Sequence, residues 1–411
     1  MKQDILFQNP DEVYNHFLRG DLSGRDKIMD VIPDLAVQLA GTPQDHRWHS
    51  EGDVLCHTGM VIDELLAGQR FSRLPEYLRQ VVLMAAVLHD CSKPEKTRHE
   101  MDGSITSHHH ASAGSIKARG ILYRSGFDPK FREMVCTLIA LHHKPIWVAR
   151  RYSENELIKF GYITQGLAPL VALCDADARG RVTEDPAQHK EAIELVQLFE
   201  IMAEDNDLLM NPPVFSDDHS RFMFCQDVSK WHFGTPVYDD YRGGVTILSG
   251  IAGSGKNTWV SQNGYGKPVI CLDDIRNELN RRDGAVIQEA ILRAKKYMAS
   301  STPFIWNSTN LTINERSRLI EMAMNYKTKI EIVAIETPYD EIKKRNKTRP
   351  GDEMLPKDVL EYMIDKWQFP NLTESHSFSW IDGMNFNQVN KIDQSQIEYS
   401  FFNQNDFAIR L

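Results

Sequence analysis

The sequence is poor in the features that place a protein outside the cell or in a membrane. Its six cysteines are scattered and none is part of a C-x-x-C pair, which argues against a zinc knuckle or a disulfide framework. No apolar run approaches the roughly 18 residues that a membrane span needs. The first residues, Met1-Lys2-Gln3-Asp4, lack the charged and then apolar pattern of a signal peptide. We therefore expect a cytoplasmic protein with no membrane partner.

Basic residues are also fewer than acidic ones. Lysine and arginine number 47 against 57 aspartates and glutamates, which gives a formal net charge of −10 with the histidines neutral. This balance argues against a protein that coats nucleic acid through a broad basic surface, but it does not exclude an enzyme that grips only a strand end. One local basic cluster is present, at Lys343, Lys344, Arg345, Lys347 and Arg349.

The 411 residues are enough for two domains, and the hydrophobic pattern changes between them. Residues 1 to about 205 have apolar side chains at helical spacing and almost no strand-like alternation. After residue 243, short β-branched runs alternate with helical segments, which predicts a parallel sheet covered by helices on both faces. We predict an all-α bundle over residues 1–208, a linker or adaptor over 209–243, an α/β domain over 244–383 and a tail without an assigned role over 384–411.

The segments expected in the bundle are helices 31–39, 58–66, 78–88, 112–122, 131–141 and 187–202. Those expected in the α/β domain are strands 245–248, 269–272, 304–306 and 330–335, and helices 285–300, 312–325, 338–347 and 356–367.

Histidine is abundant, with fifteen in all, and most histidines lie in the first half of the chain at the ends of predicted helices. Imidazoles and carboxylates that arrive from several helix ends can build one or two divalent-metal sites in a helical bundle. Any single member could instead cap a helix or face solvent, so the prediction rests on the ordered set. Its members are His57, His89, Asp90, His108, His109, His110, His142, His143, Asp175 and Asp177.

This ordered set resembles the HD phosphohydrolase superfamily over roughly residues 45–185. The resemblance is carried by HSEGDVLCHT at 49–58, HDCSK at 89–93, HASAG at 110–114 and ADARGR at 176–181. The amino-acid sequence of these four segments is especially similar to that of the HD domains attached to tRNA CCA-adding enzymes.

The resemblance implies a set of metal ligands and a chemistry. The ligands of one metal would be His57, His89, Asp90 and Asp177, with Asp175 as an alternative to Asp177. A second metal would be completed by His110 and one or both of His142 and His143. The metals, left open among Mn, Fe, Ni, Co, Zn and Mg, would lower the pKa of a bound water and promote phosphoester hydrolysis. Lys93 would hold a substrate phosphate or assist proton transfer, unless it only caps a helix.

A phosphate-binding loop follows the predicted strand 245–248. Residues 250–256 spell GIAGSGK, the pattern G-x-x-x-x-G-K between a strand and a helix. Backbone N–H groups of such a loop close around phosphates, and Lys256 would meet the β and γ oxygens of ATP or another NTP. Asn257 stands where Ser or Thr normally offers Mg²⁺ a hydroxyl, which places the metal geometry in doubt rather than nucleotide binding. The residues expected to bind nucleotide here are Gly250, Gly253, Ser254, Gly255, Lys256, Asn257 and Thr258.

An acidic and basic pair follows the predicted strand 269–272. A carboxylate at the carboxyl end of such a strand lies where open α/β sheets bind ligands. Asp273 is the predicted general base and Arg276 the predicted clamp for an acceptor phosphate, unless the aspartates only begin a helix. Arg345 and Arg349, at i and i+4, share one helix face and would close over the donor phosphates, unless they belong to a merely exposed basic helix.

Together these features resemble the 5′-OH polynucleotide kinases over roughly residues 244–370. The matching segments are 250–258, 273–276, 308–310, 345–349 and 356–360; Ser308 departs from the pattern, which usually has Asp before Thr-Asn. The order of the two domains resembles the HD-Pnk type of bifunctional end-healing enzyme.

That joint resemblance implies two activities. One is phosphoryl transfer from an NTP with Mg²⁺ to a 5′-OH end of RNA or DNA, and the other is hydrolysis of a 2′,3′-cyclic or terminal phosphate, with a separate ligase as partner. Two other interpretations stay open. One is a nucleotide-metabolism enzyme acting on free nucleotides or a small-molecule acceptor, and the other is a regulatory protein that senses metal and NTP without turnover.

Overall fold

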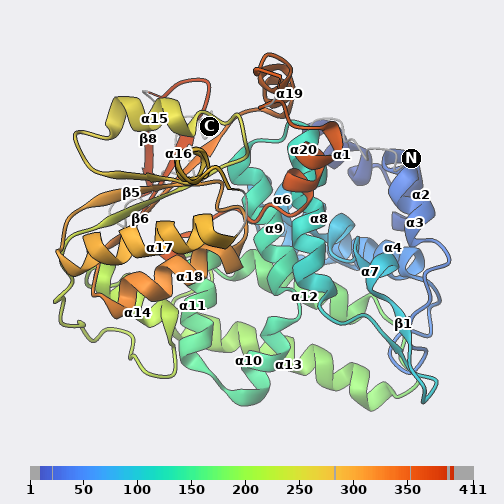
Figure 1. The fold of residues 1–411 in the computed structure, drawn as a ribbon. Helices are drawn as coiled ribbons and strands as arrows, with labels where there is room; N and C mark the ends of the chain where they lie inside the picture. Colours follow the sequence, from blue (N-terminus) through green and yellow to red (C-terminus); the bar gives the residue numbers. More distant parts are fainter. Residues whose placement is uncertain (1–9, 21, 282–283, 352, 387–388, 393–411) are drawn as a thin grey trace, which may run out of the picture. The chain divides into compact units, whose positions relative to one another are not determined.

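A computed structural model describes the chain except for residues 1–9, 21, 282–283, 352, 387–388 and 393–411 (Figure 1). The chain divides into two compact units, Met1–Pro213 and Val214–Leu411. No single helix among the described residues has the length and apolar content to cross a membrane; helices Glu154–Thr164 and Ala168–Arg179, bent by 107°, meet those criteria only when taken together.

The first unit is a bundle of helices. They are α1 (Pro10–Leu18), α2 (Gly24–Val31), α3 (Pro33–Leu39), α4 (Val54–Ala67), α5 (Gln69–Ser72), α6 (Glu76–Leu88), α7 (Lys93–Lys96), α8 (His110–Arg124), α9 (Pro129–Leu141), α10 (Lys144–Arg151), α11 (Glu154–Thr164), α12 (Ala168–Arg179) and α13 (Pro186–Asp205). A short antiparallel hairpin, β1 (Arg98–His99) and β2 (Ile105–Thr106), lies between α7 and α8.

Two helices at the centre of the bundle bring polar residues to one place. Helix α6 is buried on every side over residues 81–88, and α12 is buried over 169–178 and packs against α4, α6 and α9. A helix that is apolar all round is stable only inside a core. The end of α12 approaches α4 so closely that a Cβ on Gly180 would lie 2.6 Å from the backbone nitrogen of Val61. Glycine at position 180 therefore permits the contact that joins α4 to α12.

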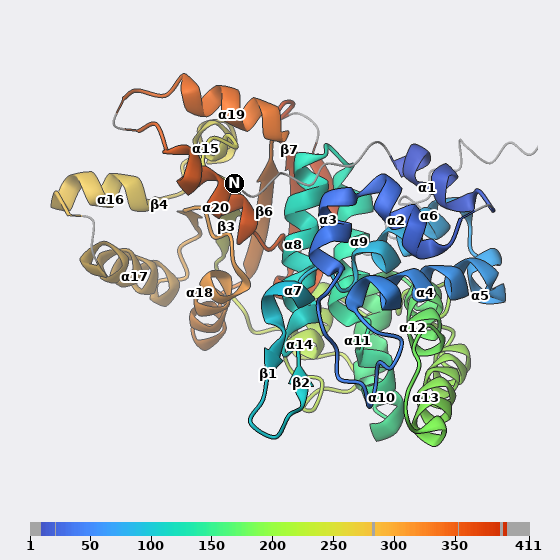
Figure 2. The same ribbon diagram turned by 90° about the vertical axis from the view of Figure 1, so that its right-hand side faces the viewer.

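The second unit is a six-stranded sheet with helices on both faces (Figure 2). Its strands are β3 (Val245–Ser249), β4 (Val269–Cys271), β5 (Phe304–Asn307), β6 (Ile330–Glu336), β7 (Ser377–Asp382) and β8 (Val389–Ile392) in the order β4-β5-β3-β6-β7-β8. The first five strands of that order are parallel, and β8 is antiparallel to β7. The helices are α14 (Asp218–Gln226), α15 (Lys256–Asn263), α16 (Leu272–Leu279), α17 (Gly284–Ala299), α18 (Ile313–Asn325), α19 (Tyr339–Lys347) and α20 (Lys357–Asp365), with a 3₁₀ turn, η1 (Leu372–Glu374).

Alternating side chains of the strands fill two cores. Ile247 faces a core shared with α14, α17 and α18, whereas its neighbour Leu248 faces a smaller core with Trp259 and Val260 of α15. Because successive side chains of a strand point to opposite faces, a strand that is buried on both faces reads as a continuous apolar run. Because β3, β4 and β5 are parallel, their carboxyl ends share one edge of the sheet. Ligands bind at this edge in open α/β folds.

The predicted fold class is confirmed: an all-α bundle precedes an α/β unit with a parallel sheet, and each predicted helix and strand lies on an observed element of its own type. Several elements were not predicted, among them α1, α10 and α11 of the bundle and three elements of the second unit. Strand β7 is interrupted by serines, which concealed its apolar Phe378, Trp380 and Ile381. Strand β8 lies in the expected tail, of which residues 387–388 and 393–411 are outside the described residues.

The third unpredicted element of the second unit, α14, lies in the segment 209–243 that was expected to be a linker or adaptor. Its Phe222 is fully buried in the core of the second unit. Arg221, 1% exposed, donates hydrogen bonds to the carbonyls of Ser375 (3.1 Å) and His376 (2.6 Å). At least this part of the segment is therefore integral to the second unit.

Candidate functional sites

The helix ends of the first unit bring together the ligands predicted for one metal. His57 comes from α4, His89 and Asp90 follow α6, and Asp177 lies near the end of α12, all of them almost fully buried. The Nε2 atom of His57 is 3.1 Å from Asp177 Oδ1 and 3.9 Å from Asp90 Oδ2, and His89 Nε2 is 3.2 Å from Asp90 Oδ2. The ligand atoms of His57, His89 and Asp177 lie within 4.8 Å of one another.

A second group of imidazoles adjoins the first. Ligand atoms of His110, His142 and His143 also lie within 4.8 Å of one another, and the Nε2 atoms of His110 and His143 are 2.8 Å apart. Asp90 connects the groups, since its Oδ1 is 3.3 Å from His110 Nε2 while its Oδ2 faces His57 and His89. Both His142 and His143 belong to this group, although the sequence left open whether one or both would.

Backbone carbonyls fix the imidazoles in one orientation. The Nδ1 atoms of His89, His110 and His142 each lie 2.7 Å from the carbonyl oxygen three residues earlier, and His57 Nδ1 lies 3.0 Å from Gly180 O. A carbonyl oxygen can only accept, so Nδ1 carries the proton in each ring and Nε2 presents a lone pair.

The Nε2 atoms of His57, His89 and His142 face the buried carboxylates, and His143 Nε2 can donate to His110 Nε2. The buried atoms His89 Nε2, His142 Nε2 and Asp90 Oδ1 have no hydrogen-bond partner. Unpaired buried acceptors cost free energy, which a cation among them would offset. The residues present therefore fit one or two divalent metal ions.

The charges of the group also suit a metal. Burial alone would raise the pKa of Asp90, but the neighbouring Lys93 and His89 outweigh it and hold that pKa well below its usual value. Burial, with the nearby His89, lowers the pKa of His142 to about 3. Ionised carboxylates and neutral imidazoles are the forms that bind metals.

Two further predictions concern Asp175 and Lys93. Asp175 lies outside the cluster, in ion pairs with Arg70 (2.9 Å) and Arg179 (3.0 Å), so the geometry places Asp177 and not Asp175 beside His57. Lys93, 6% exposed, is the first residue of α7, and its Nζ is 2.7 Å from Asp90 Oδ2 and 2.7 Å from Gln44 Oε1. The Lys93 side chain is thus held beside Asp90, and its role toward a substrate phosphate stays a prediction.

Sequence reasoning assigned no role to three residues that surround the cluster. Glu51 Oε1 lies 2.7 Å from His49 Nδ1 and 3.0 Å from His57 Nδ1, and Arg181 NH2 lies 2.8 Å from Asp177 Oδ1. All three occur in the segments that carry the HD resemblance, but only the fold shows which atoms they face.

In the second unit, residues 250–255 connect β3 to α15 as the predicted phosphate-binding loop. Gly253 and Gly255 have φ angles of 87° and 100°, in the left-handed region that favours glycine, and a Cβ on Gly255 would lie 2.5 Å from the ring of Phe386. Lys256 Nζ donates to the carbonyls of Gly250 (2.8 Å) and Ile251 (3.0 Å). Burial lowers the pKa of Lys256 to about 8, while the charge of Asp273 raises it and that of Arg349 lowers it.

The other predicted nucleotide ligands differ in exposure. Ser254 is buried and its Oγ has no hydrogen-bond partner, whereas Asn257 and Thr258 at the start of α15 are exposed. Asn257 Oδ1 accepts a hydrogen bond of 2.8 Å from the side chain of Asn307 at the end of β5. A metal at Asn257 would have to share this oxygen or displace the Asn307 side chain. The sequence analysis assigned no role to Asn307.

Asp273 and Arg276, predicted to act on the acceptor, lie on α16. Of the two arginines predicted to close over the donor phosphates, Arg345 lies on α19 and Arg349 in the turn that follows it. Asp273 and Arg276 form an ion pair with each other on the exposed side of α16. Arg345 reaches the phosphate-binding loop, with NH1 3.3 Å from Gly253 O and NH2 3.0 Å from Gly383 O. Arg349 donates to the carbonyl of Glu353 at 3.2 Å. The structure thus brings Arg345 into hydrogen-bond contact with the loop, whereas Arg349 lies beyond the end of α19, so the two do not share a helix face, and acts on Lys256 through its charge.

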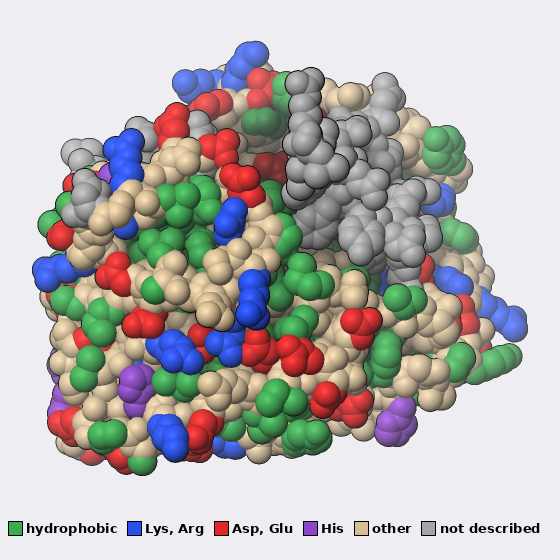
Figure 3. Space-filling view, turned by 180° about the vertical axis from the view of Figure 1, so that it is seen from behind, with side chains coloured by type: hydrophobic (Ala, Val, Ile, Leu, Met, Phe, Trp, Pro, Cys, Tyr) green, Lys and Arg blue, Asp and Glu red, His purple; other side chains and the backbone are tan. Residues whose placement is uncertain are grey.

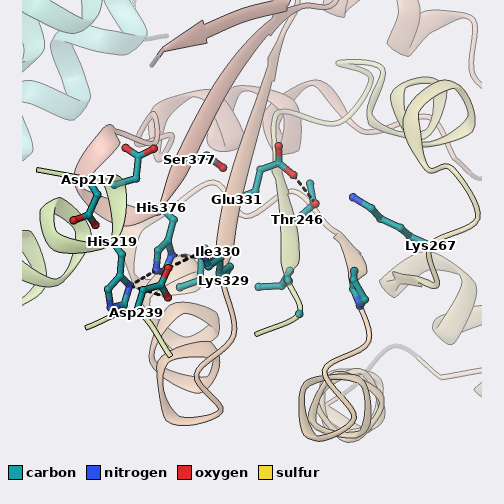
Figure 4. A pocket seen from close by; sticks show the side chains of 15 residues that line it. Asp217, His219, Asp239, Thr246, Lys267, Lys329, Ile330, Glu331, His376 and Ser377 are labelled. Carbon is teal, nitrogen blue, oxygen red and sulfur yellow. Dashed lines mark hydrogen bonds and ion pairs between the residues drawn. The ribbon is translucent and has the colours of Figure 1, made fainter. Parts of the chain in front are cut away.

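A pocket of about 600 Å³ opens at the other edge of the sheet, at the amino ends of the strands (Figure 4). His219 from α14 and His376 lie face to face in it, with His376 Nε2 3.1 Å from His219 Nδ1. The Ile330 N–H donates to His376 Nδ1, so the proton of that ring is on Nε2, and burial lowers its pKa to about 3.

Three of the charged groups that line this pocket have partners within it. Asp239 pairs with Lys329 at 2.7 Å, and Glu331 accepts from the Thr246 hydroxyl at 2.7 Å. Of these contacts, the histidine pair is the one that joins α14 to the segment before β7.

The comparisons with known proteins agree with the two sites. Residues 64–178 match the family model of the HD domain, and residues 245–370 match that of an AAA domain. The chain thus joins a segment that matches the HD domain to a P-loop segment that matches an AAA domain. His57, His49 and Glu51 precede the matched HD segment, so their place in the metal centre rests on geometry.

Two solved structures are similar to part of the chain. A candidate kinase from Chloroflexus aurantiacus J-10-fl is 15% identical, with a TM-score of 0.32, over 39% of this chain and 94% of that protein. A sugar kinase from Janibacter sp. HTCC2649 is 16% identical, with a TM-score of 0.28, over 40% of this chain and 96% of that protein. At these scores neither structure bears on the substrate of this chain.

Proposed function

We propose that this protein heals the ends of broken RNA or DNA strands. The P-loop unit transfers the γ-phosphoryl group of ATP or another NTP to a 5′-OH end. The HD unit hydrolyses a 2′,3′-cyclic or terminal phosphate at the other end. Breaks left by metal-independent ribonucleases carry these two kinds of end, and healing both prepares them for a separate ligase.

The exposure of the acceptor side of the kinase carries this proposal. The side chains of Asp273 and Arg276 are 76% and 42% exposed. A kinase for a small metabolite encloses its acceptor in a pocket that excludes water. A solvent-exposed base, Asp273, and an exposed phosphate-binding residue, Arg276, can accept the end of a long strand. The remaining nucleotides of that strand would extend into solvent.

Surface charge is compatible with binding at an end rather than along a strand. On the face of the molecule in Figure 3, basic and acidic side chains are interspersed. With a net charge of −10, affinity would come from a few local contacts and not from a long basic surface.

In the kinase, each residue has a distinct task. Asp273 accepts the proton of the attacking 5′-hydroxyl, and Arg276, released from its ion pair with Asp273, binds the adjacent strand phosphate. Lys256 leaves the carbonyls of the loop to contact the donor phosphates. Arg345, already at Gly253, stabilises the negative charge of the transferring group. Mg²⁺ would reside with the nucleotide near Asn257.

In the HD unit, the chain supplies a buried frame around the ends of its helices. A divalent metal bound there would lower the pKa of a water and neutralise phosphate oxygens. His57, His89, Asp90 and Asp177 would hold one metal, and His110, His142 and His143 would hold a second. Lys93, beside Asp90, would bind a phosphate oxygen of the substrate.

A comparison of acceptors tests this proposal. With ATP and Mg²⁺, a 5′-OH oligonucleotide is expected to be phosphorylated with a kcat/KM about 100-fold or more above that of a nucleoside, a 3′-mononucleotide or a sugar, which corresponds to roughly 2.7 kcal/mol of additional transition-state binding. Equal or better use of a small acceptor would support a nucleotide-metabolism enzyme instead. Binding of NTP without any turnover would support a sensor.

A further inference from the structure

We propose that Glu51 is a positioning residue of the metal centre. Its carboxylate holds the imidazole of His57 from the side opposite the metal, so that Nε2 is the atom that binds. This inference rests on the metal centre of the proposed function, but not on the identity of the substrate.

Both oxygens of Glu51 are committed to contacts that fix its place. The side chain is 2% exposed. Oε2 accepts a hydrogen bond of 2.8 Å from the Val182 N–H, and Oε1 lies 2.7 Å from His49 Nδ1 and 3.0 Å from His57 Nδ1. The segment is held a second time by a backbone hydrogen bond of 2.6 Å from Ser50 N to Val182 O. Glu51 is therefore a fixed point between α4 and the loop after α12.

The contacts of His57 determine which nitrogen binds the metal. Its Nδ1 faces two acceptors, the Gly180 carbonyl oxygen and Glu51 Oε1, each at 3.0 Å. The proton must be on Nδ1, since three acceptor atoms would otherwise face one another. The lone pair of Nε2 then points to Asp177, 3.1 Å away. A carboxylate on the distal nitrogen of a ligating histidine both orients the ring and increases its basicity.

An alternative is that Glu51 is itself a ligand. The ligand atoms of His49, Glu51 and His57 also lie within 4.8 Å of one another. In that group, however, His57 would have to bind through Nδ1, the nitrogen on which Gly180 holds the proton. A protonated nitrogen has no lone pair for a metal, so the geometry assigns Glu51 an orienting role.

Glu51 also adds a negative charge that, among the described residues, no lysine or arginine pairs with directly. Asp90 is paired with Lys93 at 2.7 Å and Asp177 with Arg181 at 2.8 Å. Within the described part of the chain, the ion-pair partners of Glu51 are the two imidazoles of His49 and His57, with no lysine or arginine among them. Arg181, paired directly with Asp177, interacts with Glu51 at longer range, and the buried carboxylate adds to the attraction for a divalent cation at His57.

Glu51→Gln, which keeps the shape and removes the charge, tests the proposal. We expect the affinity of the full chain for Mn²⁺, measured by calorimetry without substrate, to fall by roughly 10- to 100-fold. In chains labelled with ¹⁵N-histidine, the His57 nitrogens should also lose the pattern of a single Nδ1–H tautomer. Glu184→Gln is the control, because Glu184 lies two residues after Val182 but is 55% exposed, and its carboxylate pairs with His46 outside the metal centre.

The outcomes separate this inference from the proposed function. Mn²⁺ affinity within twofold of wild type and an unchanged His57 tautomer in Glu51→Gln would overturn it. If that variant does not fold, Glu51→Asp, which keeps the charge but shortens the reach to His57, should still weaken Mn²⁺ binding, and wild-type affinity there would overturn it equally. Failure of the wild-type protein on oligonucleotides would refute end healing and leave these metal affinities unchanged.

Discussion

Replacing His89 or Asp90 with alanine is expected to reduce phosphoesterase turnover to background while leaving the 5′-kinase activity at its wild-type level. Asp90 is the residue on which both metal groups depend, since one oxygen faces His57 and His89 and the other faces His110. His89 contributes a buried Nε2 that has no other hydrogen-bond partner. The kinase residues lie in a separate unit with its own cores, so they do not require the metal centre to be intact.

The alanine variants need a control for folding, because Asp90→Ala leaves the buried Lys93 without its anion, a change that costs about 3–5 kcal/mol in buried pairs. Kinase turnover in the same preparation reports that the second unit is folded, and circular dichroism reports the helices of the first. Equal loss of both activities in a well-folded variant would contradict the model of two separate sites.

The second large effect concerns the kinase base. Asp273→Ala should reduce phosphorylation of a 5′-OH end by roughly 10²–10⁴-fold, the usual effect of a lost general base, with the affinity for NTP unchanged. Because the Asp273 side chain is 76% exposed, its removal should not disturb folding. Arg276→Ala should instead raise the KM for the acceptor, since its guanidinium is predicted to bind the strand phosphate.

Asp274→Ala is the matched control, since Asp274 is the adjacent carboxylate on the same helix turn. Single-turnover kinetics with each variant separate the chemical step from acceptor binding. A severe defect in Asp274→Ala and a mild one in Asp273→Ala would show that the assignment of the pair is reversed.

Sequence alone predicted the parts of both sites that depend on order along the chain. The phosphate-binding loop is contiguous, so its spacing and its flanking strand and helix can be recognised directly. The predicted metal ligands mostly lie at or near the ends of buried helices, and the ordered series from His57 to Asp177 indicated a common centre before any contact was visible.

Choices that depend on which way a side chain points could not be made in advance. Asp175 and Asp177 are two residues apart on α12 and so face different neighbours, the first Arg70 and the second His57. The same limit applies to contacts between distant segments. Nothing in the local sequence relates Glu51 to Val182, or His219 to His376, because these pairs meet only when helices and strands have packed.

The most direct test of end healing uses one oligonucleotide with a 5′-OH and a 2′,3′-cyclic phosphate, incubated with ATP, Mg²⁺ and a transition metal such as Mn²⁺. Mapping both ends of the product by mass spectrometry measures the two activities on one molecule. The account predicts a 5′-phosphate and an opened or removed cyclic phosphate, so that a ligase can then join the strand. An oligonucleotide recovered with both ends unchanged, by a protein that turns over free nucleotides under the same conditions, would contradict it.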